Sequence, residues 1–149
     1  MGLESLYQEI ILDHYRAKHH AGLRQPYSVE VTHVNPSCGD ELVLRLALAG
    51  DRVEDLSYLA EGCSISQAST SVMSDLVIGR RLDEAVGLHD GFQAMLEGQG
   101  RVELDEEVYG DAVAFSGVAQ FPARVKCAML GWAAFRDAVW RASPGGTDD

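Results

Sequence analysis

Three short segments of alternating apolar and polar residues constrain the fold of this chain more than any other feature. Val29–Val34 alternates as a strand should, and the next segment carries leucine at every second position. Those leucines are Leu42, Leu44, Leu46 and Leu48. A Gly50-Asp51 turn follows, and then Val53–Ala60 alternates again. Because short connections join neighbouring antiparallel strands, we predict a three-stranded antiparallel meander.

This topology brings distant polar residues to one edge of the sheet. The Asn35–Asp40 turn joins the first two strands there, and the third strand returns to the same edge just before Cys63. We therefore expect Cys38, Asp40 and Cys63 to be neighbours, although they are far apart in the sequence.

Apolar residues at helical spacing predict one helix before the strands in the sequence and three helices after them. The predicted helices are Leu3–Ala17, a segment from Cys63 to a stop at Gly79, Leu82–Glu97 and Pro122–Arg141. The fold class is therefore α+β, a small antiparallel sheet with helices packed against it, in a single domain over residues 1–142. We expect the tail at 143–149 to be disordered. The acidic stretch Gly98–Asp111 is either a solvated loop or a docking surface.

Composition narrows the classes of partner and chemistry. The formal net charge of −11 argues against nucleic acid, whose phosphates require Lys and Arg. The N-terminus has no secretory signal pattern and no apolar run is long enough to span a membrane, so we expect a cytoplasmic protein without membrane contacts. Because the cytoplasm keeps thiols reduced, three cysteines without a CxxC pair indicate metal or thiol chemistry rather than disulfides.

The third cysteine, Cys127, lies in the last predicted helix. A lone helical cysteine is usually a small buried apolar residue. Two further cysteines placed together by topology favour a shared site instead. Three thiols and the Asp40 carboxylate make a four-coordinate set that zinc accepts. Spacing alone leaves structural zinc, a reactive thiol and a metal-cluster scaffold all open.

Two other groups of polar residues have both a functional and a purely structural interpretation. His14, His19 and His20 could be metal ligands, but we interpret them as helix-surface and loop side chains, because a cysteine set is already available. The hydroxyl-rich start of the helix after Cys63 indicates either capping and side-chain solvation or the polar rim of a site.

With these residues identified, the chain resembles the iron–sulfur assembly scaffold family that includes IscU and the N-terminal domain of NifU, and most closely its SufU branch. The matching motifs are Leu6-Tyr7, Asp13-His14-Tyr15, Asn35-Pro36-Ser37-Cys38-Gly39-Asp40, Gly62-Cys63-Ser64-Ile65-Ser66 and Arg124-Val125-Lys126-Cys127. Two departures from the IscU pattern favour SufU. Lys126 stands where IscU has a histidine, and the interval between Cys63 and Cys127 is long.

The resemblance implies an α+β fold and a zinc-dependent sulfur-transfer activity. By resemblance, Cys38, Asp40, Cys63 and Cys127 hold Zn²⁺, and Cys38 accepts persulfide sulfur from a SufS-type cysteine desulfurase for delivery to downstream iron–sulfur assembly proteins. Lys126 and Arg124 either assist by placing positive charge near the thiolates or are solvated surface residues. The alternatives are a scaffold that assembles an iron–sulfur cluster on the same ligands, and a structural zinc adaptor protein.

Overall fold

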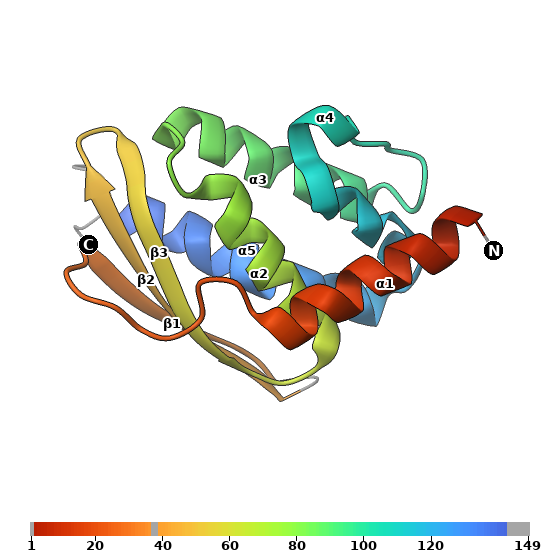
Figure 1. The fold of residues 1–149 in the computed structure, drawn as a ribbon, viewed down its shortest axis with the longest axis horizontal. Helices are drawn as coiled ribbons and strands as arrows, with labels where there is room; N and C mark the ends of the chain where they lie inside the picture. Colours follow the sequence, from red (N-terminus) through yellow and green to blue (C-terminus); the bar gives the residue numbers. More distant parts are fainter. Residues whose placement is uncertain (1, 37–38, 143–149) are drawn as a thin grey trace.

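A computed structural model describes residues 2–36 and 39–142 of the chain. Its elements follow the order α1, three strands, α2, α3, α4, the 3-10 helix η1 and α5 (Figure 1). Their bounds are α1 Gly2–Ala17, β1 Val29–Asn35, β2 Asp40–Ala49, β3 Arg52–Glu61, α2 Ser64–Val77, α3 Leu82–Glu97, α4 Glu106–Tyr109, η1 Gly110–Gln120 and α5 Pro122–Ala142.

The sheet has the predicted topology, with order β1-β2-β3 and both pairs antiparallel. Leu44 of β2 pairs with Val31 of β1 and with Tyr58 of β3. The α+β fold class predicted from the sequence is confirmed. Asp40, the first residue of β2, and Glu61, the last residue of β3, consequently lie at the same edge, as the meander requires.

The buried face of β2 follows the predicted alternation until the strand nears its end. Leu42, Leu44 and Leu46 are fully buried. At the register shift that follows, β3 carries one extra residue, because Ala47 pairs with Asp55 and Leu48 pairs with Val53. Leu48 therefore stays on the face of the other three leucines, opposite the fully buried Val53, and packs against the core although it is only partly covered.

Helices α2 and α5 pack on each other, α5 lies against β1 and β2, and α2 contacts β3. Their close approach depends on small residues. A Cβ atom added to Gly131 of α5 would lie 3.1 Å from the Cβ of Thr70 in α2, and the Ser69 hydroxyl donates a 2.7 Å hydrogen bond to the Ala128 carbonyl. Small residues of α5 thus face α2, whereas Trp140 near the end of the same helix is exposed.

The segment after α3 holds two elements that sequence patterns did not predict, the short helix α4 and the 3-10 helix η1. Residues 110–120 form the 3-10 helix η1, which packs against α1, α3 and α5. Its apolar residues are buried around most of its circumference, so it shows no amphipathic period. The buried residues are Ala112, Val113, Ala114, Phe115, Val118 and Ala119. The preceding acidic side chains remain exposed to solvent.

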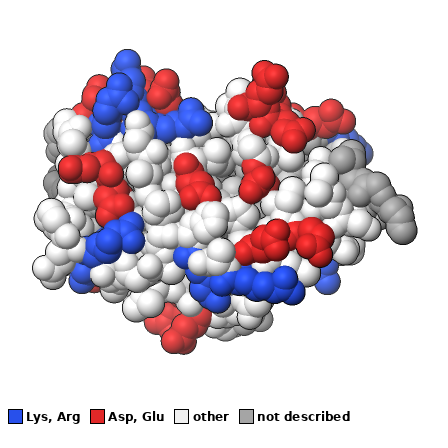
Figure 2. Space-filling view, in the orientation of Figure 1, with Lys and Arg blue, Asp and Glu red and all other residues white. Residues whose placement is uncertain are grey.

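The charge on the molecular surface is mixed on the face that Figure 2 shows. Acidic side chains are scattered over this face, with separate groups of Lys and Arg among them. No helix in the described part of the chain is both long and apolar enough to cross a membrane. The expected disorder of 143–149 concerns residues outside the described ranges.

Candidate metal centre

Asp40, Cys63 and Cys127 converge where the sheet meets the start of α2 and the first turns of α5. One carboxylate oxygen and the two sulfur atoms all lie within 4.8 Å of one another. Asp40 opens β2, Cys63 is the N-cap residue of α2, and Cys127 belongs to α5. Three residues that the sequence singled out are thus brought together from three elements.

Asp40 is the centre of this cluster and is fully buried. Its Oδ1 accepts a 2.9 Å hydrogen bond from the backbone N–H of Cys63, and its Oδ2 lies 3.6 Å from the Cys63 sulfur. These two contacts fix the carboxylate relative to the start of α2. A buried carboxylate needs such partners or a cation, because burying an isolated charge is strongly unfavourable.

Gly62 lets the chain pass directly over Asp40. Its φ of +136° is a conformation that residues with side chains rarely adopt, and a Cβ atom there would lie 2.9 Å from the Asp40 Cα. The same Cβ would collide with the Asp40 carboxylate. Gln67 of α2 holds the segment in place by donating a 2.9 Å hydrogen bond to the Gly62 carbonyl. A glycine at this position is therefore required for the cluster to form.

The two cysteines differ in accessibility. Cys63 is partly exposed and Cys127 is buried, and no disulfide joins them. Cys127 precedes Gly131 by one helical turn, so the close α2–α5 contact holds its sulfur near the start of α2. The fourth predicted ligand, Cys38, lies outside the described residues, although it stands only two positions before Asp40 in the chain.

Arg124 and Lys126 are both exposed on the first turns of α5. The Arg124 guanidinium lies over the Phe121 ring, 5.0 Å from its centroid, and has no carboxylate partner among the described residues. Lys126 likewise forms no hydrogen bond or ion pair within the described part of the chain. Both cations are therefore available to an incoming partner.

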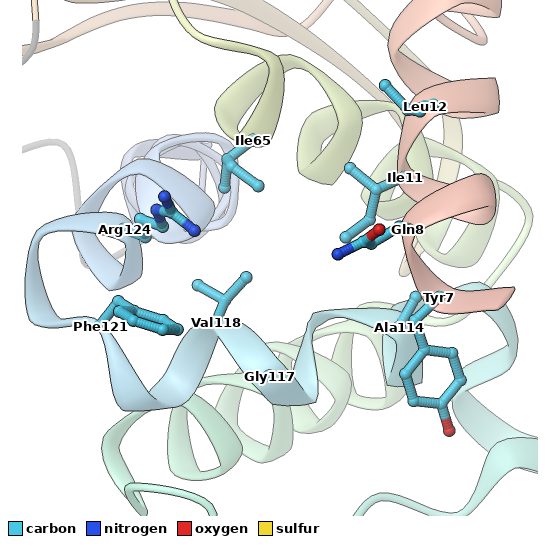
Figure 3. Close-up of a pocket in the computed structure, with 10 residues that line it drawn as sticks. All are labelled: Tyr7, Gln8, Ile11, Leu12, Ile65, Ala114, Gly117, Val118, Phe121 and Arg124. Carbon is cyan, nitrogen blue, oxygen red and sulfur yellow. The ribbon is translucent and has the colours of Figure 1, made fainter. Parts of the chain in front are cut away.

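An open groove of about 460 Å³ lies beside the cluster, between α1, η1 and the beginnings of α2 and α5. Ile65, two residues after Cys63, and Arg124, three residues before Cys127, both line it. In Figure 3 the side chains of Ile11, Ile65 and Val118 point into this space, and the Arg124 guanidinium lies at its margin. Sequence analysis did not predict the groove. The only available signal was the apolar face of α1, on which Leu6 and Leu12 remain exposed.

The chemistry of the donor set fits a zinc ion. Two sulfurs and one carboxylate oxygen suit a borderline-soft metal with tetrahedral preference, and buried Asp40 has only Cys63 as a described partner. In the described residues the cluster supplies three ligand atoms, so a closed four-coordinate site requires one more.

Comparison with known proteins agrees with this architecture. Residues 6–138 match the model of the NifU-like N terminal domain. The chain is 39% identical over 142 residues to the iron–sulfur cluster assembly scaffold protein IscU of Streptococcus pyogenes serotype M1, covering 95% of this chain and 87% of that protein. It is also 39% identical over 144 residues to the zinc-dependent sulfurtransferase SufU of Bacillus subtilis, covering 96% and 95%.

A solved structure from Fervidobacterium islandicum superimposes with a TM-score of 0.81 at 35% identity, covering 88% of this chain and 94% of that one. That protein is described as a candidate scaffold for the SUF system of iron–sulfur cluster assembly. The sequence match, the shared fold and the resemblance of the motifs agree, and the chain belongs to the NifU-like N-terminal domain family of iron–sulfur cluster assembly proteins.

Proposed function

We propose that this protein is a zinc-dependent sulfur-transfer protein that accepts persulfide sulfur from a SufS-type cysteine desulfurase. The observation that carries the proposal is the convergence of Asp40, Cys63 and Cys127 beside an apolar groove. Together with Cys38 these residues would hold one zinc ion. Zinc would keep the sulfurs deprotonated without redox chemistry of its own.

Each residue has a distinct part in this proposal. Asp40, held by the backbone N–H of Cys63, orients its carboxylate toward the two sulfurs. Cys63 and Cys127 are fixed by helices that pack on the core. The sequence Pro36-Ser37-Cys38-Gly39 is typical of a turn, from which we expect a partner to reach the Cys38 sulfur. Cys38 is therefore the proposed sulfur acceptor.

The transfer step needs no external oxidant or reductant. The Cys38 thiolate attacks the outer sulfur of the desulfurase persulfide and forms a new S–S bond. The old S–S bond breaks, and its electron pair leaves with the cysteine thiolate of the desulfurase. The product is a persulfide on Cys38, ready for delivery to downstream iron–sulfur assembly proteins.

The groove offers a docking surface for the desulfurase next to the thiols. Its apolar lining and the exposed Phe121 suit an apolar segment of a partner, and Arg124 supplies a cation without a described carboxylate partner. An acidic side chain on the partner would complement this guanidinium. Arg124 and Lys126 would also place positive charge near the reacting sulfurs.

A second candidate function is a scaffold on which an iron–sulfur cluster is assembled. This chain is 39% identical both to the Streptococcus relative that is named a scaffold and to the Bacillus relative that is named a sulfurtransferase. Lys126 favours sulfur transfer, because a protonated ammonium cannot donate a lone pair to iron or zinc. The resemblance to IscU leads us to expect a histidine at that position in a scaffold.

Metal analysis coupled to a desulfurase assay tests the proposal. Anaerobically purified protein should contain zinc without the colour of an iron–sulfur cluster, and it should stimulate a SufS-type desulfurase. Arg124→Ala should keep its zinc but stimulate less, whereas Arg101→Ala, which removes an exposed arginine that does not line the groove, should behave as wild type. A coloured, iron-containing protein that fails to stimulate the enzyme would overturn the proposal in favour of the scaffold.

A further inference from the structure

A second cluster of potential metal ligands lies far from the cysteines. His14 near the end of α1, His19 in the following loop and Asp75 near the end of α2 offer ligand atoms that all lie within 4.8 Å of one another. Asp75 stands twelve residues after the α2 N-cap Cys63, which corresponds to about 18 Å along a helix. The two clusters are therefore separate.

His14 was expected on the helix surface, and that expectation is wrong, because the residue is only 4% exposed. Its Nε2 lies 2.8 Å from Oδ2 of Asp111 in η1. A carboxylate can only accept a hydrogen bond, so in the neutral ring the proton resides on Nε2 and Nδ1 carries a lone pair. A histidine whose other nitrogen donates to a carboxylate is the usual arrangement of a metal ligand.

The Nδ1 lone pair of His14 is directed at Ser71 of α2. The Ser71 hydroxyl donates a 2.7 Å hydrogen bond to this Nδ1 and accepts a 2.9 Å hydrogen bond from the His19 backbone N–H, so an ion bound at Nδ1 would take the place of the Ser71 proton. The His14 and His19 rings lie 4.7 Å apart. Ser71 thus brings both imidazoles to one point on the surface of α2.

Both oxygens of Asp75 face imidazole nitrogens. Oδ2 lies 2.6 Å from Nδ1 of His19, and Oδ1 lies 3.1 Å from Nε2 of His20. The His19 side chain is 44% exposed and that of Asp75 is 39% exposed, so an ion can reach them from solvent. The His19 carbonyl is anchored independently by a 2.8 Å hydrogen bond from the Tyr58 hydroxyl.

From this geometry we infer a second metal site, at which His14, His19 and Asp75 bind one divalent transition-metal ion such as zinc, with His20 within reach as a fourth ligand. Imidazole and carboxylate ligands suit zinc, nickel or copper rather than magnesium or calcium. The bound ion would join the end of α1 and the loop after it to α2. Since α1 forms one wall of the groove beside the cysteines, the ion would also hold that wall in position.

Equilibrium dialysis against zinc, followed by metal analysis of the full chain, tests this site. His19→Ala and Asp75→Asn should each bind one zinc per chain fewer than wild type. The backbone groups of His19 keep their hydrogen bonds in the first variant, so it should remain folded. His33→Ala is the matched control, because His33 also pairs with an aspartate, Asp137, at 2.8 Å but belongs to neither cluster.

The difference in zinc count isolates this site whether or not the cysteine cluster binds zinc. During a zinc titration, NMR signals of the His19 and His20 rings should shift while those of His33 stay in place, and excess magnesium should not reverse the shift. Equal zinc counts in wild type, His19→Ala and Asp75→Asn would overturn the inference. An equal loss of zinc in His33→Ala, or displacement by magnesium, would overturn it as well.

Discussion

Substitution of Gly62 by alanine should damage the metal centre without touching any ligand. The added Cβ would meet the Asp40 carboxylate and lie 2.9 Å from the Asp40 Cα, which cannot rotate away. Overpacking of this kind costs about 1–3 kcal/mol. The φ of +136° adds backbone strain of about 1–3 kcal/mol for a residue with a side chain. We therefore expect the free energy of unfolding to fall by roughly 2–6 kcal/mol.

Urea unfolding of Gly62→Ala, monitored by circular dichroism, measures this loss. With a urea dependence of about 2 kcal/mol per molar, the midpoint should fall by about 1–3 M. Metal analysis of the same samples should find much less zinc, because Asp40 and the Cys63 backbone can no longer approach each other.

The matched control is Gly50→Ala at the opposite edge of the sheet. Gly50 also has a positive φ, +64°, but a Cβ atom there would meet nothing within 4 Å. This variant should lose about 1–2 kcal/mol through backbone strain alone and retain its zinc. If Gly62→Ala matched Gly50→Ala in both stability and zinc content, the proposed role of the Gly62–Asp40 contact would be wrong.

Three further predictions concern the metal, Lys126 and pH. Zinc at a hundred times its Kd should stabilise the folded chain by about 2.7 kcal/mol, so removing it with a chelator should lower the melting temperature by about 5–10 °C. An unchanged melting temperature would contradict a shared site. Lys126→Ala should retain zinc by metal analysis yet transfer sulfur more slowly in the desulfurase assay; loss of zinc would show that Lys126 lies closer to the metal than proposed. The hydrogen bond from Arg24 holds the pKa of Asp55 below its ordinary value, against the opposing effect of burial. Because the pKa of Asp55 is lower in the folded chain than in the unfolded chain, the Arg24–Asp55 pair stabilises the fold above the unfolded pKa of about 3.9. This stabilisation is lost as the pH falls through the folded pKa. The effect should be under about 1 kcal/mol for this partly exposed pair, and Asp55→Asn should lack it in acid titrations of the melting temperature.

The sheet and half of the metal centre could be predicted from the sequence because both depend on local patterns. Period-two alternation and short turns determine the β1-β2-β3 order. That order alone brings Asp40 and the residues just before Cys63 to one edge. The bulge in β3 was not predicted, although the fully buried Val53 and Leu56 stand three residues apart instead of two.

Features that depend on packing between distant segments could not be predicted from sequence patterns. The position of Cys127 follows from the close approach of α5 to α2. Gly131 permits this approach, but a glycine in a helix does not by itself predict it. The burial of His14 depends on Asp111 and Ser71, which lie far away in the chain. The 3-10 helix η1 is apolar around most of its surface, so it has no period to detect. The groove follows from these same contacts.

Mapping the persulfide tests the central claim most directly. Zinc-loaded wild-type protein is reacted with a SufS-type desulfurase and cysteine, the persulfide is trapped by alkylation, and mass spectrometry locates the label. The account predicts a label mainly on Cys38, with its loss in a folded Cys38→Ala chain. A label mainly on Cys63 or Cys127 of the wild-type protein would contradict it.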